Sequence, residues 1–390
     1  MLKCLHYSQL TQLNRAMKKK YISLPLFFIL VFSFYIDGFS QCTYQHKLDS
    51  IVQLLDMPGA KFSIIYQDGR QENYATGYSD SIRKERMNLQ HVMFSGSIGK
   101  TYAAAVLYQL VEEGKVDLKE KFFNYCKGEC WLSKLPNIGD ITVEMLLQHT
   151  SGLPRYIENE QLWIDIKNNP DKVWSYKDRL QYAFDMEAVH KAGEGWAYSD
   201  TNYLLIGMLI EKVTGMDYYE VVNARILAPL DFKETYGATR RDVPRLPIGY
   251  SGLEDFFHMP KQMVVEGRYA FNPQMEWTGG GYASTTSDLA KWAKFYYEAL
   301  PFSNETLQKI VTPNPHGVLS EYDSYGMGSF IFKSAHGKAY GHTGFVPGFR
   351  SIFLYYPEQK IAVAFQTNCD TYKGKMTLLH CVDEILKAEF

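Results

Sequence analysis

Two residues in the first third of the chain have the types and spacing that nucleophilic catalysis needs. Ser97 and Lys100 stand directly before the apolar run 102–111, which has the pattern of a helix. Positions three apart lie on one helix face, so the Lys100 amine can approach the Ser97 hydroxyl and help remove its proton. The pair therefore predicts acyl transfer. Ser81 and Lys84 share the spacing, but no apolar helix follows them, and we interpret them as a surface loop.

A second group of polar residues in the middle of the chain could supply a base. Tyr198 and Asp200 stand directly before the apolar helical run 203–210. A loop tyrosine at this position can point its phenol into a cleft, where nearby ammonium groups would favour the ionised form. Because the chain contains 29 tyrosines, the motif alone is a weak signal, and most tyrosines are expected in the core.

A third motif lies near the C-terminal end, after a short stretch that resembles a strand. It consists of His342, Thr343 and Gly344. The ring and the hydroxyl can donate hydrogen bonds to a substrate carboxylate or carbonyl, and the glycine lets the backbone approach closely. Alone, the triplet would also fit a polar turn between strands. Arg350 follows soon after, either as an anchor for a substrate carboxylate or as a surface residue of a strand.

The elements that must position these motifs are strands at both ends of the chain and helices between them. Strands are expected over 61–66, 73–77, 325–332, 349–356 and 360–366, with helices over 46–57 and 375–389. Residues 100–300 have a mainly helical pattern. We therefore expect an α+β fold, with an antiparallel sheet built from both chain ends and flanked by terminal helices. A mainly helical lobe is inserted, and the site should lie between the two parts.

The joint order of the three motifs resembles the serine β-lactamase and penicillin-binding protein superfamily. Within it, the chain is most similar to the β-lactamase-related group, which contains class C β-lactamases, D,D-peptidases, D-aminopeptidases and serine esterases. The resemblance extends over about residues 45–388 and includes the segments 141–154 and 279–285. It implies the β-lactamase/transpeptidase-like form of the fold.

The resemblance also implies roles for individual residues. Ser97 would be the nucleophile, Lys100 its activator, Tyr198 the general base and His342 a partner of the substrate carboxylate or carbonyl. The oxyanion hole would use the backbone N–H groups of Ser97 and Phe345. The remaining residues expected beside the substrate are Asp200, Thr343 and Gly344.

Two positions differ from the better-known members of the superfamily. Asp200 stands where Asn is usual, and its carboxylate could keep Lys100 charged, which would favour Tyr198 as the base. His342 stands where true β-lactamases have Lys, which resembles the peptidase and esterase members more.

We therefore expect a serine hydrolase that needs no cofactor or metal ion and acts on a small ester or a D-amino-acid-type peptide or amide. The expected substrates include peptidoglycan-derived ones. The alternative is a catalytically vestigial relative that binds peptidoglycan fragments or a protein partner. Residues that distinguish an esterase from a D,D-peptidase or a D-aminopeptidase are not evident in the sequence.

The N-terminal segment has the order of an export signal. Three lysines at 18–20 precede the mostly apolar run 21–35, so we interpret residues 1–41 as a signal peptide, with Met17 as an alternative start. Residues 42–390 then form the hydrolase domain, in the periplasm or outside the cell. The alternatives are an N-terminal membrane anchor and a lipoprotein anchor at Cys42.

The charge balance bears on the possible partners, and the cysteines bear on disulfide formation. The 41 basic and 43 acidic side chains give a net charge of -2, and no nucleic-acid-binding motif is present, so nucleic acid is not expected as a partner. In an oxidising compartment, Cys126 with Cys130 and Cys369 with Cys381 could form disulfides. The alternative is that these cysteines are buried thiols.

Overall fold

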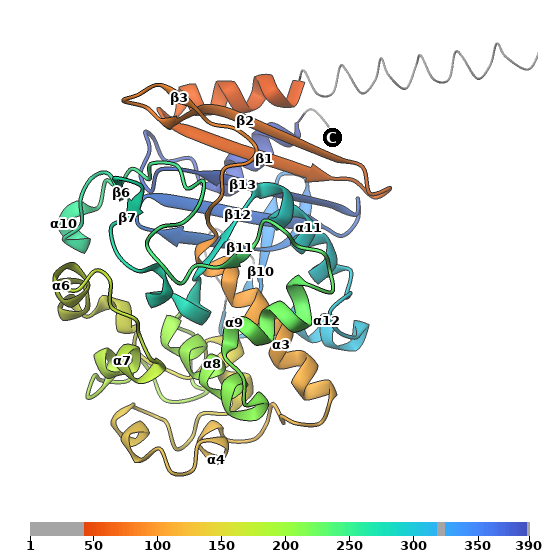
Figure 1. Cartoon of the computed structure of the whole chain (residues 1–390). Helices are drawn as coiled ribbons and strands as arrows, with labels where there is room; N and C mark the ends of the chain where they lie inside the picture. Colours follow the sequence, from red (N-terminus) through yellow and green to blue (C-terminus); the bar gives the residue numbers. More distant parts are fainter. Residues whose placement is uncertain (1–42, 318–323, 388–390) are drawn as a thin grey trace, which may run out of the picture.

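An eight-stranded antiparallel sheet lies at the centre of the protein in the computed structural model, which describes residues 43–317 and 324–387 (Figure 1). The strands follow the order β3-β2-β1-β13-β12-β11-β10-β9. Their bounds are β1 Gly59–Ile65, β2 Gln71–Asp80, β3 Glu85–Arg86, β9 Ser324–Tyr325, β10 Phe330–Ser334, β11 Gly337–Val346, β12 Phe349–Tyr356 and β13 Ile361–Thr367. Both chain ends contribute strands, which confirms the expected α+β architecture.

The first and last strands of the chain pair directly in the middle of the sheet. β1 runs antiparallel to β13, with Phe62 opposite Phe365. Every residue of both strands is buried, because helices cover both faces of the sheet. The helix over 43–54 and α13 (Leu378–Leu386) pack on one face, and α11 (Thr286–Tyr297) packs on the other (Figure 1).

The inserted helical lobe is organised around α8 (Asp200–Thr214). Its first eleven residues are all buried, which is the property of a helix surrounded by protein on every side. It packs against α3 (Lys100–Glu112) and α5 (Val143–Gln148), which places the starts of α3 and α8 close together. The other labelled helices are α4 Phe122–Tyr125, α6 Glu160–Asn168, α7 Tyr176–Leu180, α9 Tyr218–Val222, α10 Glu254–Phe257 and α12 Asn304–Ile310.

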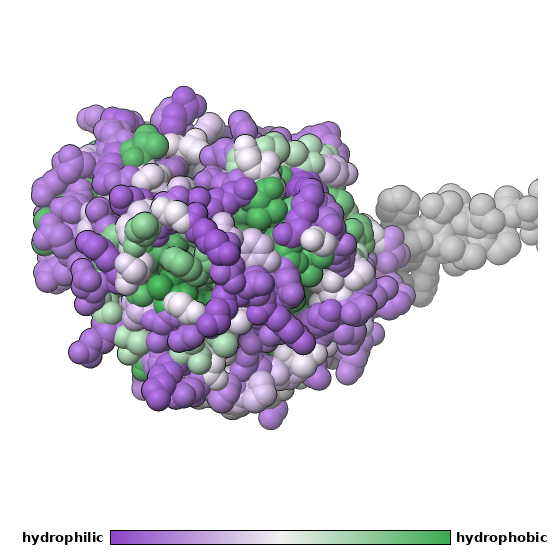
Figure 2. All heavy atoms as spheres, turned by 90° about the horizontal axis from the view of Figure 1, so that it is seen from below, coloured by the Kyte–Doolittle hydropathy of each residue, from purple (hydrophilic) through white to green (hydrophobic). Residues whose placement is uncertain are grey.

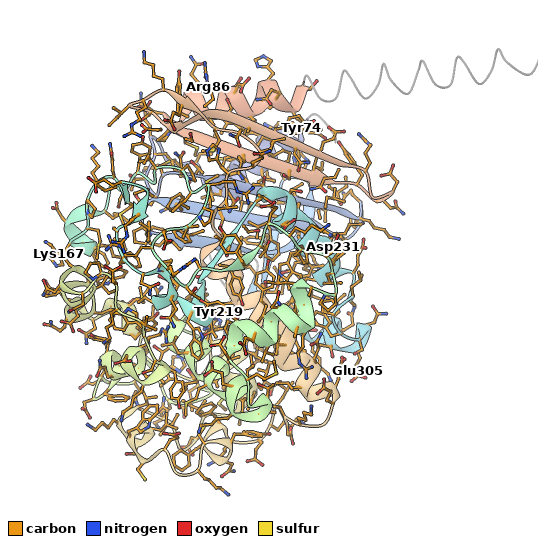
Figure 3. The ribbon with its side chains drawn as sticks, viewed as in Figure 1. Tyr74, Arg86, Lys167, Tyr219, Asp231 and Glu305 are labelled. Carbon is orange, nitrogen blue, oxygen red and sulfur yellow. The ribbon has the colours of Figure 1, made fainter. Side chains whose placement is uncertain are left out.

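A sheet of three very short strands lies next to the turn that carries Ser97 and is hydrogen-bonded to the residue that precedes the turn. β4 (Met93–Phe94) and β5 (Tyr236–Gly237) both pair with β8 (Tyr282–Ser284). The N–H of Ser95 also donates to the Tyr282 carbonyl at 2.9 Å. Tyr219, labelled in Figure 3, supports the same region by donating to the Gly281 carbonyl at 3.1 Å. A separate hairpin pairs β6 (Val264–Val265) with β7 (Arg268–Tyr269).

Several sequence-based expectations require correction. The strand expected over 325–332 is two strands, β9 and β10, because the chain turns between them and Gly328 adopts a φ of 83°. The triplet 342–344 lies inside the long strand β11 and not at the end of a short one. The four described cysteines, 126, 130, 369 and 381, are free thiols, and all but Cys130 are buried.

The N-terminal expectations concern residues that the structure does not describe. The signal peptide over 1–41, the start at Met17 and the lipoprotein site at Cys42 all lie outside the described residues. Among the helices of residues 43–317 and 324–387, none combines the length and apolar content needed to cross a bilayer. Charged side chains such as Arg86, Lys167 and Glu305 lie at the periphery (Figure 3), and Figure 2 shows hydrophobic residues in limited areas bordered by hydrophilic ones.

Candidate active site

Ser97 and Lys100 meet as their spacing predicts. Ser97 lies in the short 3-10 turn Gly96–Gly99, which runs directly into α3, and Lys100 is the first residue of that helix. The Lys100 Nζ donates to the Ser97 Oγ at 3.0 Å. A serine hydroxyl and a buried amine are therefore in hydrogen-bond contact at the start of a helix, where the helix dipole favours developing negative charge.

The surroundings of Lys100 keep its amine charged. Besides Ser97, Nζ donates to Asp200 Oδ1 at 2.6 Å and to the Gly279 carbonyl at 2.7 Å. Burial lowers the pKa of Lys100, but Asp200 and Tyr198 outweigh that effect and raise the pKa above its ordinary value. The ion pair with Asp200 that the sequence predicted is present, and Lys100 acts as a donor in the resting site.

Arg155 completes the ion-pair cluster, and the sequence analysis did not identify it. Its Nε and Nη2 both donate to Asp200 Oδ2, at 3.1 and 2.8 Å. Burial raises the pKa of Asp200, but Lys100 and Arg155 hold it below its ordinary value. Arg155 directly follows the family-like segment 141–154, and that position is the signal that could have marked it.

Tyr198 faces this cluster with a buried phenol. The Lys100 Nζ and the Arg155 guanidinium carbon lie 5.1 and 5.6 Å from the ring centroid. Burial raises the pKa of Tyr198, and this effect outweighs the opposing effects of Lys100 and Ser97. The resting phenol is therefore protonated, which corrects the expectation that neighbouring ammonium groups would favour the ionised form. Its hydroxyl has no well-formed hydrogen bond within the described part of the chain.

His342 does not occupy the position that the sequence analysis expected. Its side chain is fully buried and is absent from the lining of the cleft, whereas Thr343, Gly344 and Phe345 all line it. Nδ1 is 2.6 Å from the Thr343 carbonyl, Nε2 is 3.4 Å from the Tyr325 hydroxyl, and burial lowers the pKa to about 3. The ring of His342 is therefore neutral and enclosed, and its contact with a substrate carboxylate or carbonyl stays a prediction.

Two glycines allow strand β11 to close against the turn that carries Ser97. A Cβ at Gly344 would lie 1.8 Å from the Ser95 carbonyl oxygen, and one at Gly96 would lie 2.4 Å from the Phe345 nitrogen. Gly96 also has a φ of 54°, which side chains disfavour. The backbone of Phe345 is thus packed beside the Ser97 turn, as an oxyanion hole shared by the two segments requires.

His149 lies close to the cluster formed by Lys100, Asp200, Arg155 and Tyr198. His149 Nδ1 lies 3.2 Å from the Ser199 nitrogen and 2.9 Å from Asn202 Nδ2, and its ring packs 4.3 Å from that of Tyr198. Burial lowers its pKa well below the ordinary value, which fits a neutral packing residue.

Glu276 is a further residue that the sequence analysis missed. An ideal Cβ at Gly279 would lie 3.8 Å from Lys100 Nζ and 3.9 Å from Glu276 Oε2, so the carboxylate lies near the same amine. Burial, followed by Asp200, raises the pKa of Glu276 to about 7. Its place just before the glycine-rich segment 279–285 is the signal that could have marked it.

A cleft of about 900 Å³ opens over the Ser97 hydroxyl. One wall is largely apolar, and cationic and polar side chains interrupt it. The lining includes Ser97, Arg155, Tyr198, Phe256, Phe257, Phe330, Phe345, Arg350, Asp370, Tyr372 and Lys375. No group of three or more side chains suited to binding a metal ion occurs in residues 43–317 and 324–387. The arrangement can activate a hydroxyl and receive a peptide-sized carbonyl compound.

The family model described as Beta-lactamase matches residues 49–379. The chain therefore belongs to the beta-lactamase family, whose members are serine hydrolases, and it is a hydrolase of the β-lactamase fold.

Individual relatives agree with this family. Penicillin-binding protein 4* of Bacillus subtilis is 24% identical over 304 residues. The match covers 76% of this chain and 65% of the relative, so the chain spans just under two thirds of the relative's length. A D-stereospecific amidohydrolase from Streptomyces is 26% identical with a TM-score of 0.75, over 90% of this chain and 98% of that structure. D-amino acid amidase from Ochrobactrum anthropi SV3 in complex with D-phenylalanine is 24% identical, with a TM-score of 0.75 and the same coverages, and shows the shared fold.

Proposed function

We propose that the protein hydrolyses small esters or D-amino-acid-type amides and peptides through an acyl-enzyme formed on Ser97. The observation that carries this proposal is the 3.0 Å hydrogen bond between Lys100 Nζ and Ser97 Oγ at the floor of the cleft. A nucleophile in contact with a buried amine, beside a strand that can donate backbone hydrogen bonds, is the arrangement that acyl transfer needs.

The first half-reaction joins Ser97 Oγ to the substrate carbonyl carbon. As this bond forms, the proton of the hydroxyl passes to a base, and the backbone N–H groups of Ser97 and Phe345 stabilise the oxyanion. Collapse of the tetrahedral intermediate breaks the bond to the leaving amine or alcohol, which receives a proton from the same base. Water then attacks the acyl carbon while the base takes its proton, the bond between Ser97 Oγ and the acyl carbon breaks with return of that proton to Oγ, and the acid product leaves.

Tyr198 is the base that the charges favour. Lys100 and Arg155 are cations and Asp200 is an anion, so the cluster carries one net positive charge while Tyr198 is protonated. Loss of the phenolic proton brings this cluster to neutrality, whereas loss of the Lys100 proton would leave Asp200 without one of its two cationic partners. The Tyr198 phenolate forms only transiently, because burial raises the resting pKa.

Two observations support substrates of the D-amino-acid type. Solved structures with a similar fold include a D-stereospecific amidohydrolase and a D-amino acid amidase. The cleft also offers aromatic side chains at Phe256, Phe257 and Phe345 that suit an apolar substituent beside the reacting carbonyl.

The alternative function is a binding protein with a vestigial site. The observation that favours it is the retention of charge on Lys100, which deprives Ser97 of a neutral amine as its base. The two functions differ in whether Ser97 can be acylated.

Labelling with a fluorophosphonate tests the proposal. Intact mass should show one label on the wild type and none on the Ser97→Ala variant. Ser81→Ala is the matched control because Ser81 and Lys84 have the same spacing outside the cleft, and it should label like the wild type. A folded wild type without label would favour the binding protein. If the wild type labels, fresh unlabelled enzyme should be tested for release of ammonia from D-amino acid amides and their L enantiomers.

A further inference from the structure

His149 is hydrogen-bonded to the chain on both sides of Tyr198. It directly follows the last residue of α5 and is fully buried. Its backbone carbonyl accepts the N–H of Ala197 at 3.0 Å, and its Nδ1 accepts the N–H of Ser199 at 3.2 Å. One residue of the helical lobe therefore holds both chain neighbours of Tyr198, one through its backbone and the other through its ring.

The partners of the His149 ring fix the position of its proton. A backbone N–H can only donate, so Nδ1 is an acceptor toward Ser199. The side-chain amide of Asn202 agrees, because its Oδ1 accepts the Ser151 hydroxyl at 2.5 Å, which leaves Nδ2 to donate to Nδ1 at 2.9 Å. With two donors directed at Nδ1, the ring is the neutral tautomer that carries its proton on Nε2.

The same ring packs against the phenol of Tyr198. The two ring centroids are 4.3 Å apart, and the planes make an angle of 35°. The rings of Tyr325 and Tyr203 lie 5.0 and 5.5 Å from that of His149. Burial, followed by the charge of Lys100, lowers the pKa of His149 well below its ordinary value. The imidazole thus stays uncharged while it packs beside the proposed base.

The backbone of His149 shows that the turn alone does not require this side chain. Its φ of 59° and ψ of 35° are left-handed, a conformation that glycine adopts without cost and that Asn tolerates well. A glycine here would leave the buried Ser199 N–H and the Asn202 amide without their shared acceptor, which is unfavourable. The imidazole therefore supplies an acceptor that the turn by itself would lack.

We propose that His149 is a positioning residue, which holds Tyr198 at the distance from Ser97 that proton transfer needs, through the neutral acceptor Nδ1. His149 exchanges no proton in the reaction, and the proton on Nε2 stays in place. Proton transfer requires donor and acceptor within hydrogen-bond reach, and a displacement of about 1 Å can cost about 100-fold in rate. This inference rests on the proposed function, because it concerns the base of the same site.

Two amide substitutions separate the roles of the ring nitrogens. In His149→Asn the side-chain amide lies near the position of Nδ1, so an acceptor is kept, whereas in His149→Gln it reaches the position of Nε2 and the acceptor is lost. We expect the rate of fluorophosphonate labelling of Ser97 to fall by less than about 3-fold with Asn and by about 10- to 100-fold with Gln. His380→Gln, at an exposed position of α13, is the control and should label like the wild type.

A double-mutant cycle with Tyr198→Phe distinguishes positioning from general damage to the site. If His149 acts through Tyr198, then His149→Gln should slow the residual labelling of Tyr198→Phe by no more than about 2-fold, because the base that it positions is already absent. Slowing by the same factor in both backgrounds would overturn the proposal. Equal labelling rates in His149→Asn and His149→Gln would overturn it as well.

The tautomer of His149 can be measured on the wild type, so the test does not depend on the folding of a variant. Two-bond ¹H–¹⁵N spectra of the imidazoles, assigned with His149→Asn, should show a protonated Nε2 and a bare Nδ1 that do not change between pH 5 and 9. A ring that titrates in this range, or that carries its proton on Nδ1, would refute the proposal whether or not Ser97 is labelled. Failure of the proposed function looks different: a folded wild type without label refutes the hydrolase, and with it the catalytic use of this contact, while the tautomer stays as expected.

Discussion

Replacement of Asp200 by Asn would test the electrostatic account of the site. The carboxylate pairs with Lys100 at 2.6 Å and with Arg155 at 2.8 Å. At 2.6 Å and an effective dielectric constant of about 20, one such pair is worth about 6 kcal/mol of attraction before the cost of desolvation. Because Asn keeps the shape but leaves two cations without a counter-ion, we expect the free energy of unfolding to fall by about 3–5 kcal/mol.

The same substitution should change the pH dependence of Ser97 reactivity. Asp200 raises the pKa of Lys100 and burial lowers it, so removal of the carboxylate lets the pKa fall. The amine then becomes neutral at lower pH and can serve as a base. The pH at which the fluorophosphonate labelling rate rises should move downward by at least one unit, towards neutrality.

Urea unfolding and labelling rates between pH 5 and 10, on the wild type and Asp200→Asn, provide both measurements. Lys121→Met, which removes an exposed ion pair with Asp140, is the control and should change the unfolding free energy by less than about 1 kcal/mol. Unchanged unfolding together with superimposed labelling profiles would refute the view that Asp200 fixes the charge on Lys100.

Three further results are expected. Tyr198→Phe should slow labelling of Ser97 by about 10²- to 10⁴-fold because it removes the proposed base; a rate equal to that of the wild type would assign the base elsewhere. Gly344→Ala should abolish labelling, since the added methyl group would overlap a backbone oxygen at 1.8 Å, whereas Gly139→Ala, with open space around it, should label normally. Lys61 is fully buried, and burial lowers its pKa to about 7. Between about pH 7 and 10 the unfolded chain therefore binds one more proton than the folded chain, and the free energy of unfolding rises with pH by up to about 1.4 kcal/mol per pH unit. Urea titrations should show this slope in the wild type and not in Lys61→Met, and an equal slope in both proteins would contradict the low pKa.

The parts of the site that the sequence revealed are those encoded by short-range spacing. Ser97 and Lys100 are neighbours on one helical turn, so their contact follows from local geometry. The order of the motifs then pointed to Asp200 as a partner of Lys100. Arg155 escaped notice because its contact with Asp200 spans 45 positions and depends on how α8 packs.

His342 shows why strand residues are harder to place from sequence. Successive side chains in a strand face opposite sides, so a triplet cannot direct all its members into one cleft. In β11, the backbone of Gly344 and the residues Thr343 and Phe345 line the cleft, while His342 turns into a cluster of aromatic rings. The two-residue strands β4 and β5 carry too little pattern to be recognised at all.

The central place of β13 has a consequence for the order in which the protein can become active during synthesis. Its residues 361–367 separate β1 from β12 and are synthesised long after β1. Until they leave the ribosome, the hairpin of β1 and β2 has no partner on that side, and β12 and β11 lack their neighbour. Because contacts of such large sequence separation form slowly, a nascent chain carries Ser97 and Lys100 on an early helix without the strand wall that completes the cleft. Assembly of the cleft is thereby delayed until residues 361–367 have been synthesised.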